Sequence, residues 1–182
     1  KRELFKQLTQ VPDYSWPCIT LALVTISGVL AIDALALTNR ISYAAAFPML
    51  IFVYYWFFSV IHDGVHRSIA KNKTVNDWVG RAAIFAFAPY ASIHLFRWAH
   101  MEHHRFTNNE GDPDIWSHGP TWSLPLRWMT IDFYYAYRAL ISKSPAVRKV
   151  FRESLPMIVL GIAVVAAIIY MGYGLEYLVL WF

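Results

Sequence analysis

The sequence predicts an all-α, multi-pass membrane protein, and two observations lead to this prediction. Hydrophobic residues make up 57% of the 182 positions and charged residues only 15%. In soluble domains roughly a quarter of all residues are charged. The charges are also unevenly placed: residues 41–61 and 154–175 contain none, and residues 14–39 contain only Asp33. Each of these runs reaches the length of about 20 residues that a helix needs to cross a bilayer.

The composition also excludes several other classes of protein. The high apolar content excludes intrinsic disorder, and the single cysteine, Cys18, excludes a disulfide scaffold. The net charge of +4 at neutral pH fits basic residues that face a membrane surface, so it gives no reason to expect nucleic acid as a partner.

Three transmembrane helices are expected, followed by the start of a fourth. The first covers about residues 16–37 and is too long for a cleavable signal peptide. A short polar connector leads to the second, at about residues 42–62, so the two should form an antiparallel hairpin. The third covers about residues 156–172 and begins at Pro156, because proline is favoured in the first turn of a helix.

Residues 177–182 are apolar again, and we interpret them as the stub of the fourth helix. Six helical residues rise only about 9 Å, far less than a bilayer crossing. The chain is therefore expected to be one incomplete membrane domain, and the lack of an initiator methionine at Lys1 agrees with this interpretation.

Basic residues cluster on one side of the predicted helices. Lysine and arginine are frequent before residue 7, between residues 67 and 73, and between residues 143 and 152, whereas the hairpin connector has only Arg40. The positive-inside rule then places the N-terminus and residues 62–155 in the cytoplasm.

The predicted cytoplasmic segment is expected to cap the transmembrane helices with further helical structure. Apolar and aromatic residues recur at helical spacing over residues 122–141, which predicts a helix that lies in the membrane surface. Residues 82–96 are uncharged and rich in aromatic side chains, and Pro89 interrupts this stretch of 15 residues, so we expect a buried or re-entrant element there.

All seven histidines lie in this segment, and five of them form two clusters. In each cluster the first histidine is followed by another three or four residues later, which places these side chains on one face of a helix. Two imidazoles so placed can reach one metal ion, and imidazole binds iron, zinc, copper and nickel alike. The five predicted metal ligands are His62, His66, His100, His103 and His104.

The other two histidines, His94 and His118, are secondary metal-ligand candidates. A continuous helix would place His94 on the side opposite His100, and His118 follows a turn rich in proline and aspartate.

Other metal chemistries fit the sequence less well. A carboxylate-bridged di-iron bundle needs Glu-x-x-His pairs, and no glutamate here is followed by histidine at that spacing. A zinc metalloprotease would need glutamate where Asp63 stands, which makes it a distant alternative. The other distant alternative is a membrane metal-binding or transport protein. Transporters place ionisable residues within their spans, and here Asp33 is the only charged residue in a predicted span.

The histidine clusters resemble the first and second histidine boxes of the membrane fatty acid desaturase superfamily. The matching segments are residues 62–66 (His-Asp-Gly-Val-His), 98–108 and 112–114, and the resemblance covers roughly residues 43–116. It implies a bundle of about four transmembrane helices with a cytoplasmic His-rich cap. It also implies a non-haem centre of two iron ions, with O₂ as co-substrate.

The reaction that this resemblance implies is the introduction of a double bond into a fatty acyl chain in or at the membrane. The substrate would be a membrane lipid acyl chain or an acyl thioester. Electrons would come from a donor such as ferredoxin, rubredoxin or cytochrome b5 with its reductase. Carotenoid or alkyl-chain hydroxylases and ketolases share the boxes and stay open as alternatives. The bacterial inner membrane is favoured over the endoplasmic reticulum.

The superfamily has a third histidine box after its fourth transmembrane helix. No histidine follows His118 here, so the chain is expected to be truncated before that box. Carboxylates near the boxes can accept hydrogen bonds from imidazole N–H groups and so orient the rings. The candidates are Asp63, Asp112 and Asp114, and Asn108 is a further candidate as a ligand, a hydrogen-bond donor or a helix cap.

Overall fold

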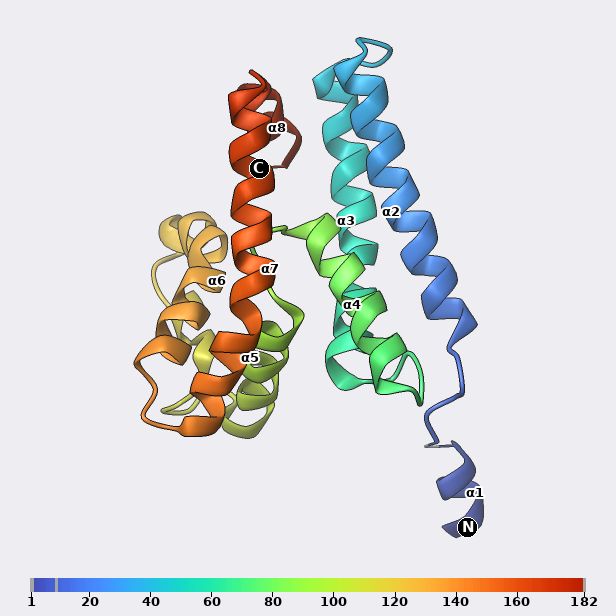
Figure 1. Ribbon diagram of the computed structural model, residues 1–182, viewed down its shortest axis with the longest axis vertical. Helices are drawn as coiled ribbons and strands as arrows, with labels where there is room; N and C mark the ends of the chain where they lie inside the picture. The colour runs from blue at the N-terminus through green and yellow to red at the C-terminus, as the bar shows by residue number, and fades with distance from the viewer. Residues whose placement is uncertain (1, 9, 182) are drawn as a thin grey trace. The chain divides into compact units, whose positions relative to one another are not determined.

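The computed structural model describes residues 2–8 and 10–181, and these residues contain helices and turns but no strand (Figure 1). Three of the helices are long and apolar enough to cross a membrane. The predicted all-α class with membrane-spanning helices is therefore confirmed.

The chain forms two compact units, which we describe separately. Unit 1 contains the residues through Phe87 and those from Ala166 onward, and unit 2 contains Ala88–Val165. The helices of unit 1 are α1 (Arg2–Leu8), α2 (Trp16–Leu37), α3 (Tyr43–His66), α4 (Lys73–Phe87) and α8 (Gly174–Trp181). Unit 2 contains α5 (Ile93–Phe106), the 3₁₀ helices η1 (Pro113–Ser117) and η2 (Thr121–Ser123), α6 (Leu124–Ile141) and most of α7 (Pro145–Tyr170).

Helices α2 and α3 form the predicted hairpin and lie side by side in Figure 1. Proline in the first turn of α2 and a left-handed Asn39 after its end define its limits. Helix α3 begins at an N-cap, where the Ser42 hydroxyl accepts a hydrogen bond from the Ala45 N–H at 3.2 Å. These local signals explain why so short a connector suffices.

Helix α2 of the hairpin buries a stripe of mostly small residues, while many large apolar side chains of the hairpin are exposed. The buried stripe of α2 recurs every three or four residues and consists of Cys18, Ala22, Thr25, Val29, Ile32 and Ala36. Leu23, Leu30 and Phe52 are each more than 60% exposed. Such a surface would be unfavourable in water, and it fits helices whose outer faces contact lipid.

Three boundaries differ from the sequence-based expectation. Helix α3 continues through its histidines to His66, because the left-handed Arg67 closes the helix only after them. Residues 82–96 are the end of α4 and the start of α5, separated by a turn at residues 88–92. The expected re-entrant element is thus two helices, because Pro89 ends one before the other starts.

The third spanning helix also differs, since α7 begins at Pro145 and contains Pro156 in its interior. Proline at position 156 removes one backbone donor, but the helix continues, and the Ser154 hydroxyl bonds the Val150 carbonyl oxygen at 2.9 Å. The charged residues before Pro156 made this first part look like a connector. The expected fourth-helix stub is helical through Trp181, and Phe182 lies outside the described residues.

Gly161 brings α7 against the turn at Pro89 within unit 2. A Cβ atom at this position would overlap the carbonyl carbon and oxygen of Pro89. Overpacking of a core typically costs about 1–3 kcal/mol, and here backbone rather than a flexible side chain would have to move. We therefore expect Gly161→Ala to lower the thermal melting temperature of the detergent-solubilised protein by several degrees.

Gly28→Ala is the matched control for this prediction. Its added methyl group would meet the Val53 side chain at 3.6 Å, an ordinary contact, so the melting temperature should barely change. Equal melting temperatures for the two variants would contradict the close approach of α7 to Pro89.

Candidate metal centre

The first histidine pair lies in the last turns of α3. The ring centroids of His62 and His66 are 4.5 Å apart, as expected for positions four residues apart on one helical face. The Phe58 ring packs on the other side of His62, with ring centroids 5.9 Å apart. Two imidazoles are therefore presented together at the end of a spanning helix.

Helix α4 holds this end of α3 in place through Asn76, which is fully buried. The Asn76 amide donates to the Gly64 carbonyl oxygen at 2.9 Å and accepts from the Ile69 N–H at 3.1 Å. Gly64 also lies so close to Gly80 that an added Cβ would be 3.1 Å from the Gly80 Cα atom. The turn between His62 and His66 is thus tied to α4 by both hydrogen bonds and close packing.

Asp63, between these histidines, is directed toward α2. Its side chain is hydrogen-bonded to the Cys18 thiol, and its main-chain oxygen accepts bonds from the Ser68 N–H at 3.0 Å and the Ser68 hydroxyl at 3.1 Å. In the structure this residue links α3 to α2 and to the turn that follows α3.

The second histidine cluster lies on α5. The Nε2 atoms of His100 and His104 are 3.0 Å apart, and the two rings are nearly perpendicular, at 87°. Two imidazole nitrogens bound to one metal ion at about 2.1 Å, with an angle near 90° between them, would be about 3 Å apart. The pair therefore has the spacing of two ligands of one ion.

His103 projects from the same helix toward a pair of aspartates. Its Nδ1 atom is 3.1 Å from both carboxylate oxygens of Asp112 and 3.3 Å from Oδ2 of Asp114. The ligand atoms of these three residues all lie within 4.8 Å of one another. The arrangement can either hold a cation directly or orient the His103 ring.

The environment of Asp112 favours orientation of the ring. Asp112 is fully buried, and it accepts backbone N–H bonds from Asn108 at 2.8 Å and Asp114 at 2.9 Å. Burial by itself raises the pKa of Asp112, but these two bonds and the bond from His103 outweigh it, so the pKa lies below its ordinary value. Asp112 is therefore an ionised acceptor at neutral pH.

This charge state determines the tautomer of His103. A carboxylate only accepts hydrogen bonds, so Nδ1 of His103 must carry the proton that it shares with Asp112. In the neutral ring, Nε2 then carries the free electron pair, which is the form that binds a metal ion.

A residue that sequence reasoning missed, Tyr135 on α6, supports this pair from the other side. Its hydroxyl donates to Oδ1 of Asp114 at 2.6 Å, and burial together with that bond raises its pKa above the ordinary value. Tyr135 also packs with Leu95 and Ala99 of α5 in one buried cluster. In the sequence it was one of several aromatic residues of a predicted surface helix, with no pattern to distinguish it.

The remaining candidates take more peripheral positions. Asn108 is in the left-handed conformation just after α5, with φ of 59°, and contributes its backbone N–H to Asp112. His94 lies in the first turn of α5, and His118 is exposed after η1. Among the described residues, neither of these two histidines belongs to a group that brings metal-ligating atoms together.

The family model described as fatty acid desaturase matches residues 40–182. The chain belongs to the fatty acid desaturase family. This membrane-bound family agrees with the three apolar helices of the structure. No solved structure matches the chain.

Similar proteins include both lipid desaturases and carotenoid ketolases. The chain is 37% identical over 81 residues to beta-carotene 4-ketolase 3 of Haematococcus lacustris, which covers 42% of the chain and 24% of that protein. It is 39% identical over 61 residues to the sn-1 oleoyl-lipid 12-desaturase of Arthrospira platensis, with coverage of 33% and 16%. The desaturase of the same name from Picosynechococcus is 28% identical over 116 residues, with coverage of 58% and 29%. The chain thus spans less than a third of the length of each relative.

Proposed function

We propose that the chain is part of an O₂-dependent iron oxidoreductase that introduces a double bond into a fatty acyl chain at the membrane. The observation that carries this proposal is the His103–Asp112 pair, which leaves Nε2 of a box histidine ready to bind metal. Family membership and the names of two relatives, both oleoyl-lipid desaturases, support the substrate class.

The residues present fit iron. Neutral imidazoles with open positions around the ion suit non-haem iron, and hydrogen abstraction from an unactivated methylene is chemistry that bound iron would supply and side chains cannot. We propose His62, His66, His100, His103 and His104 as ligands of a two-iron centre. Asp112 would hold the His103 ring in its orientation. Asp114 would contact the same ring, and the Tyr135 hydroxyl of α6 would hold Asp114 in place.

The full reaction requires partners from outside the chain. O₂ accepts four electrons when it is reduced to water, and a desaturated acyl chain supplies only two of them. We propose that the other two come from a donor of the ferredoxin, rubredoxin or cytochrome b5 type. The substrate would be a lipid acyl chain or an acyl thioester.

Carotenoid ketolation is the second candidate, because other relatives carry names such as beta-carotene 4-ketolase and zeaxanthin 4-ketolase. Both reactions begin with removal of hydrogen from a C–H bond of a hydrocarbon. They differ in whether a second hydrogen leaves or oxygen is inserted, and this depends on the placement of the substrate by less than an ångström.

Expression of the complete gene in a host with defined lipids and carotenoids distinguishes the two. Acyl chains that become lighter by two hydrogens would support desaturation, whereas carotenoids that gain oxygen would support ketolation. The matched control is the same gene with His103→Ala. If expression of the wild-type gene changes neither the lipids nor the carotenoids, the proposed function is wrong.

We also propose that the N-terminus and the histidine clusters face the cytoplasm, which the positions of the basic residues support. A membrane-impermeant maleimide applied to intact cells should then label cysteines placed at Asn39 or Tyr173, but not at Lys73 or Ser144. The native Cys18 is buried and should not react. The reverse pattern would overturn the orientation. The choice of a bacterial inner membrane stays a prediction.

A further inference from the structure

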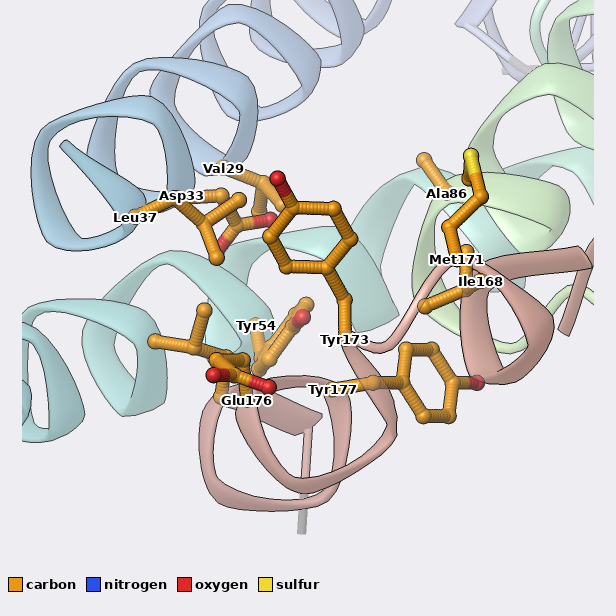
Figure 2. Close-up of a pocket in the computed structure, with 11 residues that line it drawn as sticks. Val29, Asp33, Leu37, Tyr54, Ala86, Ile168, Met171, Tyr173, Glu176 and Tyr177 are labelled. Carbon is orange, nitrogen blue, oxygen red and sulfur yellow. The ribbon is translucent and has the colours of Figure 1, made fainter.

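A cavity of about 330 Å³ lies in unit 1, between α2, α3, α4, α8 and the end of α7 (Figure 2). Its lining combines apolar side chains with two carboxylates and three tyrosines. These polar residues are Asp33, Tyr54, Tyr173, Glu176 and Tyr177. Tyr54 precedes His62 by eight positions on α3, or about 12 Å of helix. The cavity is therefore separate from the histidine pair of this unit.

The two carboxylates are incompletely satisfied. Oδ1 of Asp33 and Oε2 of Glu176 are buried and have no hydrogen-bond partner among the described residues. A buried polar atom without a partner is energetically unfavourable, and ionisable residues within spanning helices commonly mark functional sites. No lysine, arginine or histidine is among the described residues that line the cavity. A ligand that complements this lining is a hydrogen-bond donor or a cation.

The size and the lining narrow the chemistry further. A volume of about 330 Å³ is in the range of small-molecule pockets, which is far more than a bare metal ion requires. Tyrosine rings attract organic cations through their faces. Figure 2 shows the Tyr173 ring extending from just before α8 toward Asp33 on α2. Apolar side chains such as Val29 and Ile168 complete the wall and suit a hydrocarbon portion.

The position of the cavity along α2 indicates a lipid. Asp33 lies four residues before Leu37, the last residue of α2, which corresponds to about 6 Å. This is close to the level where the headgroups of a bilayer begin. The connector at the same end carries Arg40, which is exposed and has no ion pair in the described part of the chain. A cation there is placed to meet a lipid phosphate.

We propose that this cavity binds the primary ammonium group of an aminophospholipid, with Asp33 and Glu176 as its acceptors. The ammonium group supplies three N–H donors and a positive charge to two carboxylates. The phosphate faces outward, toward Arg40, and the acyl chains follow the apolar outer surface of the helices. This site is independent of the proposed oxidation chemistry.

Native mass spectrometry of the complete protein in a non-ionic detergent tests the proposal without metal or turnover. The probes are phosphatidylethanolamine and phosphatidylglycerol with identical acyl chains. Phosphatidylglycerol offers hydroxyl donors in place of the ammonium group. We expect the wild-type protein to retain phosphatidylethanolamine at least several-fold more. Equal retention of the two lipids would overturn the ammonium assignment.

Asp33→Asn and Glu176→Gln keep the size of each side chain and remove its charge. Each should lower phosphatidylethanolamine retention about tenfold, the effect of one charge-assisted hydrogen bond. Asp13→Asn is the matched control, because the Asp13 carboxylate is 81% exposed and pairs with Lys71 outside the cavity. Wild-type retention in both cavity variants would overturn the site. The two variants are measured separately, so poor folding of one leaves the other as a test.

Free ethanolamine distinguishes a lipid headgroup from a soluble amine. If the lipid is the ligand, millimolar ethanolamine should leave the bound phosphatidylethanolamine in place, since it lacks the acyl chains. If ethanolamine displaces the lipid at equal concentration, the assignment to a lipid is wrong.

Discussion

Alanine in place of any one of the five box histidines is expected to lower turnover of the complete enzyme by at least about a hundredfold. Loss of a supporting residue around a metal typically costs 10–100-fold in metal affinity or activity, and loss of a ligand should cost more. Iron content, measured on the purified protein by elemental analysis, should fall together with turnover. The variants are those at His62, His66, His100, His103 and His104.

His118→Ala is the matched control for this series. His118 is exposed, and among the described residues it belongs to no group of metal-ligating atoms, so iron content and turnover should stay near those of the wild type. Membrane insertion should be unchanged in every variant, because the apolar residues of the spanning helices are untouched. Normal turnover in two or more of the five variants would rule out this ligand set.

The positions of the spanning helices in the sequence were predictable, because long runs without charged residues mark them. Runs without charge as long as residues 41–61 allow few structures other than a membrane helix, and α2 and α3 appear close to where the runs begin. The start of α7 was not predictable in this way. Residues 145–155 are helical but contain several charged side chains. A prediction from hydropathy therefore starts the helix only at its apolar part.

The histidine spacing was equally informative, since positions four residues apart on a helix must share a face. His62 and His66 lie together for that reason, and so do His100 and His104. Which acidic residue would support which histidine depends on tertiary packing. Asp63 is next to His62 in the sequence but contacts Cys18.

The residues that support the clusters from a distance were not predictable. Asn76 fastens the end of α3 through a contact with Gly64 twelve positions earlier in the chain. Tyr135 reaches Asp114 across a separation of 21 positions. Nothing in their local sequence distinguishes either residue from a neighbouring polar or aromatic side chain, because their roles arise only when helices pack.

Replacement of Asp112 should have the largest effect of any change outside the histidines. Its carboxylate accepts bonds from three donors, namely the backbone N–H groups of Asn108 and Asp114 and Nδ1 of His103. Asp112→Ala leaves the two backbone N–H groups without this acceptor and leaves His103 only the longer contact to Asp114 at 3.3 Å. We therefore expect a loss of about 2–4 kcal/mol in the free energy of unfolding. Thermal and denaturant melts of the metal-free protein measure this loss.

Asp112→Asn separates the effect on the metal from the effect on folding. The amide retains one acceptor oxygen, but its NH₂ group faces a donor. His103 thus loses the nearer of its two carboxylate partners, the one that holds its tautomer. Iron affinity, measured by titration of the apoprotein, should fall about 10–100-fold. Asp114→Asn is the matched control, since its amide oxygen can still accept the Tyr135 hydroxyl and Asp112 still holds His103. If Asp114→Asn lowers iron affinity and Asp112→Asn does not, then Asp114 rather than Asp112 orients the histidine.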